Sequence, residues 1–277
     1  MFPSTQIPGY DFIHTLGAGS ESLVFRARER TTGEHVAIKV SHEHENASRE
    51  AAVGLAVRHP HLVHVRAAQI AEQPNFVVME LLSGVSLRCV MHQRYALPIR
   101  LALRVTRQLT EALVAMHRAG FVHGDVKPEN VQWVDAKNVV LIDLGLARRC
   151  EINSEKNECI FGTADYLAPE CCFGSSQASD RSDIFSLGVM LFEMLTGGLP
   201  YSSGTANEVI RSHRAQAPTD LRKYPGEWPW RLVRLLHRML AYRPCDRPAA
   251  TLLVQELMEL EIVAKHESPR TAVRGHS

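Results

Sequence analysis

The octapeptide H-G-D-V-K-P-E-N, residues 123–130, is the most informative stretch of this chain, and a D-L-G triplet follows it further along. Asp125 supplies a carboxylate that can orient a hydroxyl group, and Lys127 supplies a cation for a transferring phosphate. Asn130 and Asp143, the first residue of D-L-G, add two oxygen ligands of the kind that Mg²⁺ binds. Phosphoryl transfer depends on positioning and charge neutralisation more than on covalent chemistry with the protein, so these groups indicate a phosphotransferase. The octapeptide alone does not decide which class of phosphotransferase.

The composition restricts the remaining classes of function. The chain has 277 residues, 45% of them hydrophobic, and a formal net charge of +1. Such a charge gives no electrostatic reason to expect nucleic acid or an anionic membrane as a partner. The N-terminal residues lack the pattern of a signal peptide, and no apolar run is long enough to span a membrane. The six cysteines form no C-x-x-C pair, which favours a reducing compartment, so we expect a cytoplasmic protein.

Two parts of different character follow one another along the chain. The first contains short β-branched runs separated by turns, and one helical segment at about residues 47–58. After Ser83-Gly84 the apolar residues recur at helical spacing, and residues 184–196 are apolar enough for a helix that is buried on every side. We predict an α+β fold of two lobes, a small antiparallel sheet with one helix and a larger helical lobe, with a ligand cleft between them. The predicted boundaries are an N-terminal extension at 1–9, a domain at 10–263 with lobes at 10–80 and 83–263, and a disordered tail at 264–277.

A glycine-rich turn occurs in L-G-A-G-S-E-S-L-V-F, residues 16–25. Glycine lets backbone N–H groups approach phosphate oxygens without a Cβ in the way. Ser22 departs from G-x-G-x-x-G at the third glycine, and an ordinary hairpin would look the same. A strand follows the turn rather than a helix, which argues against a dinucleotide-binding fold.

Lys39, in V-A-I-K, lies on a strand predicted after this turn, within reach of bound phosphates. Such a lysine needs an anionic partner to hold it. Glu50 on the following helix is the preferred candidate because the helix ends before His59-Pro60, and Glu43 and Glu45 compete for the same role.

The order of these motifs resembles that of serine/threonine protein kinase catalytic domains, bacterial members most of all. The similarity covers residues 10–263, nearly the whole chain. Its motifs are the glycine turn, V-A-I-K, M-E-L-L, H-G-D-V-K-P-E-N, D-L-G, G-T-A-D-Y-L-A-P-E, D-I-F-S-L-G and a late R-P. The resemblance implies the two-lobed kinase fold and transfer of the γ-phosphate of ATP, with Mg²⁺ or alternatively Mn²⁺, to serine or threonine hydroxyls of proteins.

The resemblance also implies roles for the octapeptide and D-L-G. Asp125 would accept or orient the proton of the substrate hydroxyl, and Lys127 would screen the γ-phosphate. Asn130 and Asp143 would hold the metal ion. These four residues are the implied catalytic set.

A second set of residues is implied in nucleotide binding. Lys39, paired with Glu50, would fix the α- and β-phosphates. Met79 would be the gatekeeper, while the Glu80 carbonyl and the Leu82 amide would meet the adenine. The full implied set is Leu16, Gly17, Gly19, Val24, Ala37, Lys39, Glu50, Met79, Glu80, Leu82 and Gln132.

Two further contacts implied by the resemblance are architectural. Glu170 of A-P-E should form an ion pair with Arg247, and Asp183 should accept hydrogen bonds from backbone amides of the catalytic loop.

Small-molecule phosphotransferases of the aminoglycoside type also carry H-G-D. They do not resemble this chain at Lys127, at G-T-A-D-Y or at A-P-E. In the kinases that it resembles, the segment before A-P-E forms the platform for a peptide substrate. A lysine two residues after Asp125, with Thr163 near it, is the serine/threonine pattern rather than the tyrosine pattern.

Gly124 stands where the resembled family usually has an arginine that receives an activation-loop phosphate. Between Gly145 and Gly162 the only hydroxyl side chain is that of Ser154. We therefore predict activity that does not depend on phosphorylation of this loop.

The helix bearing Glu50 shows two more departures. Gly54 stands where a larger apolar side chain usually packs, and the interval from Lys39 is several residues shorter than usual. We expect a shortened, loosely packed helix that a regulatory partner could brace, with harmless drift as the alternative.

Gln132 replaces an apolar residue at the implied floor of the adenine site. An amide buried there without partners would cost about 1–3 kcal/mol, so we expect modest ATP affinity. Gly54, Gln132 and the short helix favour a pseudokinase that only binds. Retention of Lys39 and the catalytic set favours an active kinase, because a scaffold has no physical need for all five groups.

Overall fold

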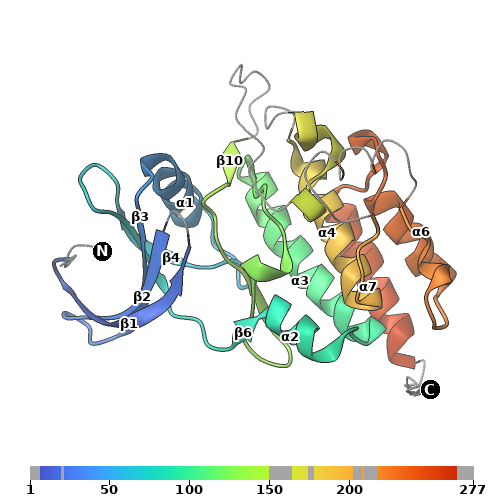
Figure 1. The fold of residues 1–277 in the computed structure, drawn as a ribbon, viewed down its shortest axis with the longest axis horizontal. Helices are drawn as coiled ribbons and strands as arrows, with labels where there is room; N and C mark the ends of the chain where they lie inside the picture. Colours follow the sequence, from blue (N-terminus) through green and yellow to red (C-terminus); the bar gives the residue numbers. More distant parts are fainter. Residues whose placement is uncertain are drawn as a thin grey trace.

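The computed structural model describes residues 7–19, 22–149, 164–173, 178–201, 208, 212 and 218–266. A β-sheet with one helix forms one lobe, and a larger helical lobe lies beside it (Figure 1). The predicted α+β fold of two lobes is confirmed.

The sheet of the small lobe has five antiparallel strands in the order β1-β2-β3-β5-β4. In β3, Lys39 lies opposite Val24 of β2 and Val77 of β5. Side chains alternate between the two faces of a strand. Ile38 therefore joins the small lobe's own core, while Ala37 lies on the other face and joins the main core. The strands are β1 Tyr10–Ala18, β2 Ser22–Glu29, β3 His35–Ser41, β4 Val65–Gln69 and β5 Asn75–Glu80.

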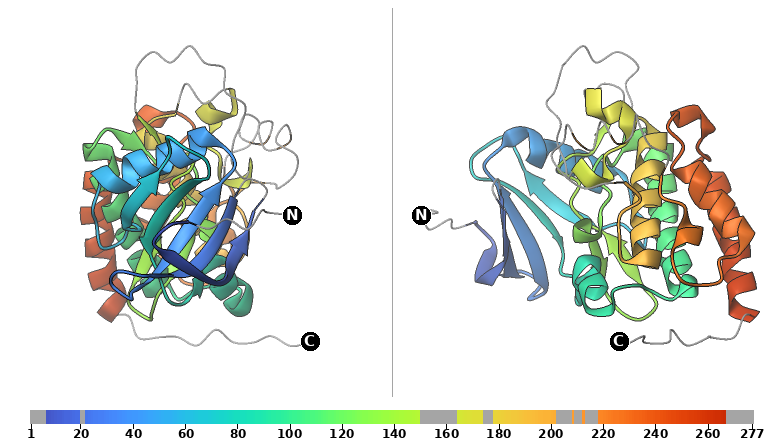
Figure 2. Two further views of the ribbon diagram at one scale, coloured as in Figure 1. Left: turned by 90° about the vertical axis from the view of Figure 1, so that its left-hand side faces the viewer. Right: turned by 45° about the vertical axis from the view of Figure 1, so that its right-hand side comes forward.

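Helix α1, His44–Ala56, packs against β3, β4 and β5 on the side of the sheet that faces the large lobe (Figures 1 and 2). The expected loose packing of this helix is wrong. Glu50 and Gly54 are both buried, and a Cβ added to Gly54 would lie 2.1 Å from Cγ2 of Val65. Val65 of β4 thus fills the space that a larger residue at position 54 would take, so the glycine is required by close approach.

Gly54→Val is expected to lower the free energy of unfolding by about 1–3 kcal/mol, because the new side chain overlaps Val65. Denaturation by urea would measure the change. Ala52→Val, on the exposed side of the same helix, is the matched control and should cost much less. Equal losses in the two variants would show that helix propensity, and not the contact with Val65, sets the cost.

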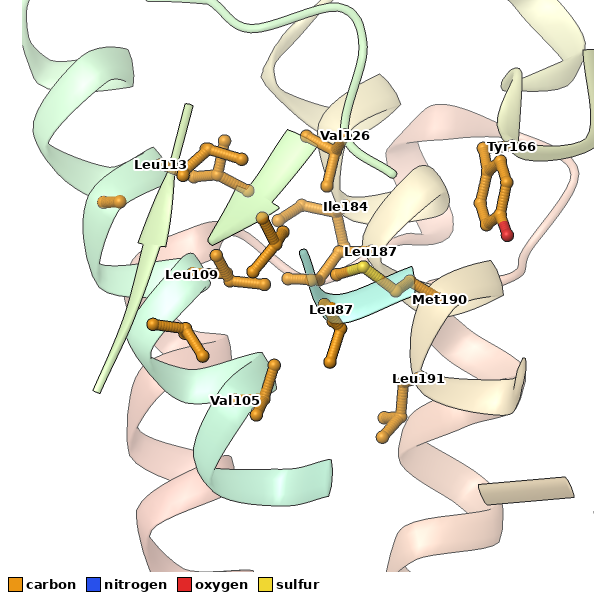
Figure 3. Close-up of a cluster of buried hydrophobic side chains, with 14 of the residues drawn as sticks. Leu87, Val105, Leu109, Leu113, Val126, Tyr166, Ile184, Leu187, Met190 and Leu191 are labelled. Carbon is orange, nitrogen blue, oxygen red and sulfur yellow. The ribbon is translucent and has the colours of Figure 1, made fainter. Parts of the chain in front are cut away.

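The large lobe is built around helix α4, Asp180–Thr196, which is buried along most of its length as the apolar run predicted. Ser179 caps its start, Ser182 completes the capping box, and Gly197 ends it with a φ of 76°. Buried side chains of α3 and α4 face one another, and Tyr166 lies beside α4 (Figure 3). The helices of this lobe are α2 Leu87–Arg94, α3 Ile99–Arg118, α4 Asp180–Thr196, α6 Trp230–Met239 and α7 Ala250–His266.

Short strands and 3₁₀ turns carry the polar residues between these helices. The strands are β6 Val85–Ser86, β7 Phe121–Val122, β8 Val131–Trp133, β9 Val139–Leu141 and β10 Arg148–Arg149. The 3₁₀ turns are η1 Pro128–Asn130, η2 Ala164–Tyr166, η3 Pro169–Phe173, η5 Leu221–Lys223 and η6 Pro244–Asp246. In the part of the chain that the structure describes, no helix combines the length and apolar character needed to cross a membrane.

One strand begins later than predicted, and one helix of the structure was not predicted. The strand expected at residues 62–68 begins only at Val65, because the residues before it bond to the large lobe instead. The Leu141 amide donates to the His61 carbonyl at 2.9 Å, and the Val63 amide donates to the Leu141 carbonyl at 2.9 Å. Helix α2 was not predicted, since its eight residues show little apolar periodicity.

Candidate active site

The side chain of Lys39, on β3, contacts side chains from α1 and from the segment after β9. Its Nζ lies 3.0 Å from Oε2 of Glu50 on α1 and 2.6 Å from Oδ1 of Asp143, which follows β9. Among the three candidate glutamates, the structure therefore places Glu50 beside the lysine. Burial alone would lower the pKa of Lys39, but the two carboxylates raise that pKa above its ordinary value, so the lysine stays cationic.

Asp143 has a φ of 65°, in the left-handed region that residues other than glycine seldom adopt. Its Oδ1 accepts hydrogen bonds from Lys39 and, at 3.3 Å, from the Gly145 amide. Burial would raise the pKa of this carboxyl, but the charge and hydrogen bond of Lys39 outweigh burial and lower the pKa. Asp143 is thus an anion at neutral pH, as a metal ligand must be.

Asp125, Lys127 and Asn130 form a second connected group in the catalytic loop. Nζ of Lys127 lies 2.7 Å from Oδ2 of Asp125. Nδ2 of Asn130 donates to Oδ2 of Asp125 at 2.7 Å and to its carbonyl at 2.9 Å. Because both bonds use the amide nitrogen, the side-chain oxygen of Asn130 is the atom suited to a metal ion.

One backbone bond joins the two groups. The Ile142 amide donates to the Asn130 carbonyl at 2.8 Å, directly before Asp143. Six polar residues predicted for the site are therefore linked through a continuous set of contacts from Glu50 to Lys127.

Asp183 of α4 accepts hydrogen bonds from backbone amides of the catalytic loop, as predicted. Its carboxylate accepts hydrogen bonds from the amides of His123 at 3.0 Å and Gly124 at 2.9 Å, and lies 2.8 Å from Nε2 of His117. Burial would raise the pKa of Asp183, but the bonds and charges around it, His117 first, lower it. Gly124 has a φ of 78°, and a Cβ there would lie 3.2 Å from the Leu146 carbonyl.

The predicted ion pair between Glu170 and Arg247 is present and bidentate. Nη1 and Nη2 of Arg247 lie 2.6 and 2.8 Å from the two oxygens of Glu170. The Arg247 side chain is fully buried, and it also donates to the carbonyls of Ala241, Tyr242 and Arg181.

Most of the residues expected around the nucleotide lie on β1, β2, β3 and β5 or directly after β1 and β5. Gly17 pairs with Val24 and Ala37 pairs with Met79, and both Ala37 and Met79 are buried. Leu16, in contrast, is 47% exposed. The other expected residues are Gly19, whose amide donates to the Ser22 carbonyl at 2.9 Å, Glu80, whose amide donates to the His64 carbonyl at 3.0 Å, and Leu82, which is half-buried.

The amide of Gln132 is not unpaired, which corrects one expectation. Its Nε2 donates to the carbonyl of Ser83 at 3.2 Å, so the side chain bonds to the segment that connects the lobes. The expected desolvation cost of an orphan amide therefore does not apply.

Gln132→Leu is expected to tighten ATP binding by less than about threefold, because the apolar side chain gains contact while Ser83 loses a hydrogen-bond donor. Isothermal titration with ATP and Mg²⁺ measures this dissociation constant. Gln93→Leu, on the exposed face of α2, is the control substitution. Weaker binding by Gln132→Leu would contradict the expectation.

The structure adds a residue that sequence reasoning missed. Arg88 on α2 bonds to Glu129, which stands next to Asn130. From the sequence, an arginine near the start of a short, polar helix is expected to lie at the surface. No neighbouring residue in the sequence indicates its partners. The sequence features Ser154 and Thr163 lie outside the described residues.

Asn130 and Asp143 are the two candidate ligands of a metal ion. Within the described ranges no group of three or more His, Cys, Asp or Glu side chains gathers as a metal site. Asn130 and Asp143 offer one amide and one carboxylate oxygen. Such a pair suits Mg²⁺, which is commonly bound by one or two carboxylates together with substrate phosphates.

Comparison with known proteins also indicates a protein kinase. The sequence pattern of the protein kinase domain family matches residues 10–258. The probable serine/threonine-protein kinase pknA2 of Bifidobacterium longum is 32% identical over 275 residues, which cover 93% of this chain and 36% of that protein. The serine/threonine-protein kinase PkaA of Streptomyces coelicolor is 34% identical over 266 residues, 87% of this chain and 48% of that protein. The serine/threonine-protein kinase PknD of Mycobacterium tuberculosis is 30% identical over 285 residues, 98% of this chain and 42% of that protein. The chain thus spans between 36% and 48% of the length of these three relatives.

Proposed function

Since this chain belongs to the protein kinase domain family, we propose that it is a serine/threonine kinase that transfers the γ-phosphate of Mg-ATP to protein hydroxyl groups. The observation that carries the proposal is the continuous set of contacts from Glu50 through Lys39 and Asp143 to Asn130, Asp125 and Lys127. The names of the relatives support the choice of serine and threonine as acceptors.

Each residue then has a task in the reaction. Lys39, held by Glu50, binds the α- and β-phosphates, and Lys127 screens the charge of the transferring group. The carboxylate of Asp143 and the amide oxygen of Asn130 would hold a divalent ion, which would supply positive charge to neutralise the phosphates; we propose Mg²⁺, with Mn²⁺ as a substitute. Asp125 orients the substrate hydroxyl and accepts its proton.

A pseudokinase is the second candidate function. Two observations that favoured it, Gly54 and Gln132, now have a structural explanation. Val65 fills the space beside Gly54, and Gln132 has a partner. A regulatory partner of α1 would have to bind its exposed side, where Leu55 is 53% exposed, because the space beside Gly54 is occupied.

The test is phosphate transfer from γ-labelled ATP to mixed protein acceptors and, separately, to small alcohols. We expect label on protein serine and threonine, none on the alcohols, and loss of transfer in Asp125→Asn. A parent chain that binds ATP but labels no protein would support the pseudokinase. Label on the alcohols alone would support a small-molecule kinase.

We also propose that phosphorylation of the activation loop is not required. Ser154→Ala should retain at least about half of the parent rate, because Gly124 offers no side chain to receive a phosphate. Ser154→Glu, the companion variant, should likewise show no activation. Initial rates of both variants against the parent decide the point, and a Ser154→Ala rate under a tenth of the parent's would contradict it.

The boundaries belong to the same proposal. We place the kinase domain at residues 10–263, with lobes at 10–80 and 83–263, and take ATP and proteins as its partners rather than nucleic acid or membrane. A cytoplasmic location is proposed from the pattern of cysteines, of which Cys89, Cys171, Cys172 and Cys245 are free thiols in the described ranges.

A further inference from the structure

Arg88, the second residue of α2, connects three elements around the catalytic loop. Its Nε lies 2.6 Å from Glu129 of η1, and its Nη1 lies 2.6 Å from Glu193 of α4. Its Nη2 donates to the hydroxyl of Tyr166 in η2, and that hydroxyl in turn donates to Glu193. All three nitrogens of the guanidinium group are thus engaged by other parts of the chain.

This cluster lies where a protein substrate would be expected to bind. Glu129 directly precedes Asn130, in the same loop as Asp125. Tyr166 belongs to the segment before A-P-E, and its carbonyl accepts a 2.7 Å hydrogen bond from Ser186 of α4. Arg88 therefore ties the expected peptide platform to the catalytic loop.

The charges in the cluster need a cation. Glu193 has an 11% exposed side chain, and Glu129 a 44% exposed one. Asp165, next to Tyr166, adds a third carboxylate, one of whose oxygens is buried with no hydrogen-bond partner among the described residues. Burial and the charge of Glu193 raise the pKa of Asp165. A buried carboxylate without a counter-ion is strongly destabilised. The carboxylates of this cluster therefore need a cation close to them.

We propose that Arg88 is a specificity-determining residue, which supplies from within the chain the cation that Glu129 and Glu193 would otherwise take from a basic residue of the protein substrate. The inference rests on the proposed kinase function. It follows that the parent chain does not select arginine beside the acceptor hydroxyl. Removal of Arg88 opens an acidic site in which a substrate arginine can take the place of the lost guanidinium group.

The experiment compares serine peptides that differ only in the two residues before the serine, Arg-Arg or Gln-Gln. For the parent we expect kcat/KM values within about threefold of each other. For Arg88→Ala the Arg-Arg peptide should be preferred about tenfold or more, a change of about 1.4 kcal/mol in transition-state binding. The double variant Arg88→Ala/Glu193→Gln should lose most of this preference. Arg222→Ala, which removes an exposed arginine paired with Asp220, is the control and should behave as the parent.

Two results would overturn the inference. One is a tenfold preference of the parent for Arg-Arg, and the other is an unchanged ratio in a folded Arg88→Ala protein. If Arg88→Ala unfolds at the assay temperature, Arg88→Gln replaces it, and both peptides are also tested for their effect on its melting temperature. The Arg-Arg peptide should then raise Tm more than the Gln-Gln peptide, and equal shifts would count against the inference.

Failure of the kinase proposal is recognised separately. If the parent phosphorylates neither peptide, fluorescence anisotropy of the same labelled peptides decides the role of Arg88. Arg88→Ala should bind the Arg-Arg peptide about tenfold more tightly than the parent does, and equal affinities would overturn the inference.

Discussion

Asp143→Asn is expected to lower kcat by about 10³-fold while the chain remains folded, because the carboxylate that we propose as a metal ligand becomes a neutral amide of the same shape. In the structure this carboxylate lies 2.6 Å from Nζ of Lys39. Asp143 itself follows β9 and has a left-handed backbone conformation. The substitution leaves Lys39 with Glu50 as its remaining carboxylate partner. We also expect a higher Mg²⁺ concentration for the half-maximal rate, since one charged ligand is lost. Steady-state kinetics over a Mg²⁺ series measures both effects.

A matched control is available in the same lobe. Asp135 lies in an exposed turn, where its carboxylate accepts hydrogen bonds from the amides of Lys137 and Asn138. Asp135→Asn makes the same chemical change away from the site, and its rate should stay within about twofold of the parent. An Asp143→Asn protein with more than a tenth of the parent rate would contradict the role given to this residue.

Arg247→Met is expected to lower the free energy of unfolding by about 3–5 kcal/mol, since it leaves Glu170 as a buried charge without its partner. The guanidinium group is fully buried and also serves three backbone carbonyls. Domains of this kind have a total stability of only about 5–15 kcal/mol, so the loss is a large fraction of it. Urea denaturation at neutral pH measures the change.

Two companion variants separate the pair from its surroundings. Arg247→Met/Glu170→Met should lose less than the two single variants added together, because neither charge is then left alone. Arg238→Met breaks the half-exposed pair with Glu256 and should cost less than about 1 kcal/mol. A loss below 1 kcal/mol for Arg247→Met would show that solvent or another group replaces the arginine.

The sequence was sufficient for the features that depend on local pattern or on ordered motifs. The two lobes, the buried helix α4 and the pairing of Lys39 with Glu50 follow from periodicity and from motif spacing. The contacts of Asp183 and of Glu170 were expected from the resemblance to protein kinases. In each case the relevant residues occur in a pattern that can be read along the chain.

The remaining features depend on residues that are distant in sequence. Gly54 looked like a gap because its neighbour, Val65, comes from another element. The amide of Gln132 looked unpaired because its acceptor is a backbone carbonyl, which carries no signature in the sequence. Arg88 had no pattern at all, since its partners come from three separate elements.

The backbone bonds from residues 61–63 to Leu141 have a mechanical consequence. They attach the segment that follows α1 to the large lobe, whereas the strands β1 to β3 have no backbone hydrogen bond to that lobe among those described; β3 contacts it through the side chains of Lys39 and Asp143. Any rocking of the sheet that preserves these bonds must pivot near them. Lys39 would then move with the sheet while Asp143 stays with the large lobe, so the 2.6 Å separation between these two side chains would lengthen as the lobes open.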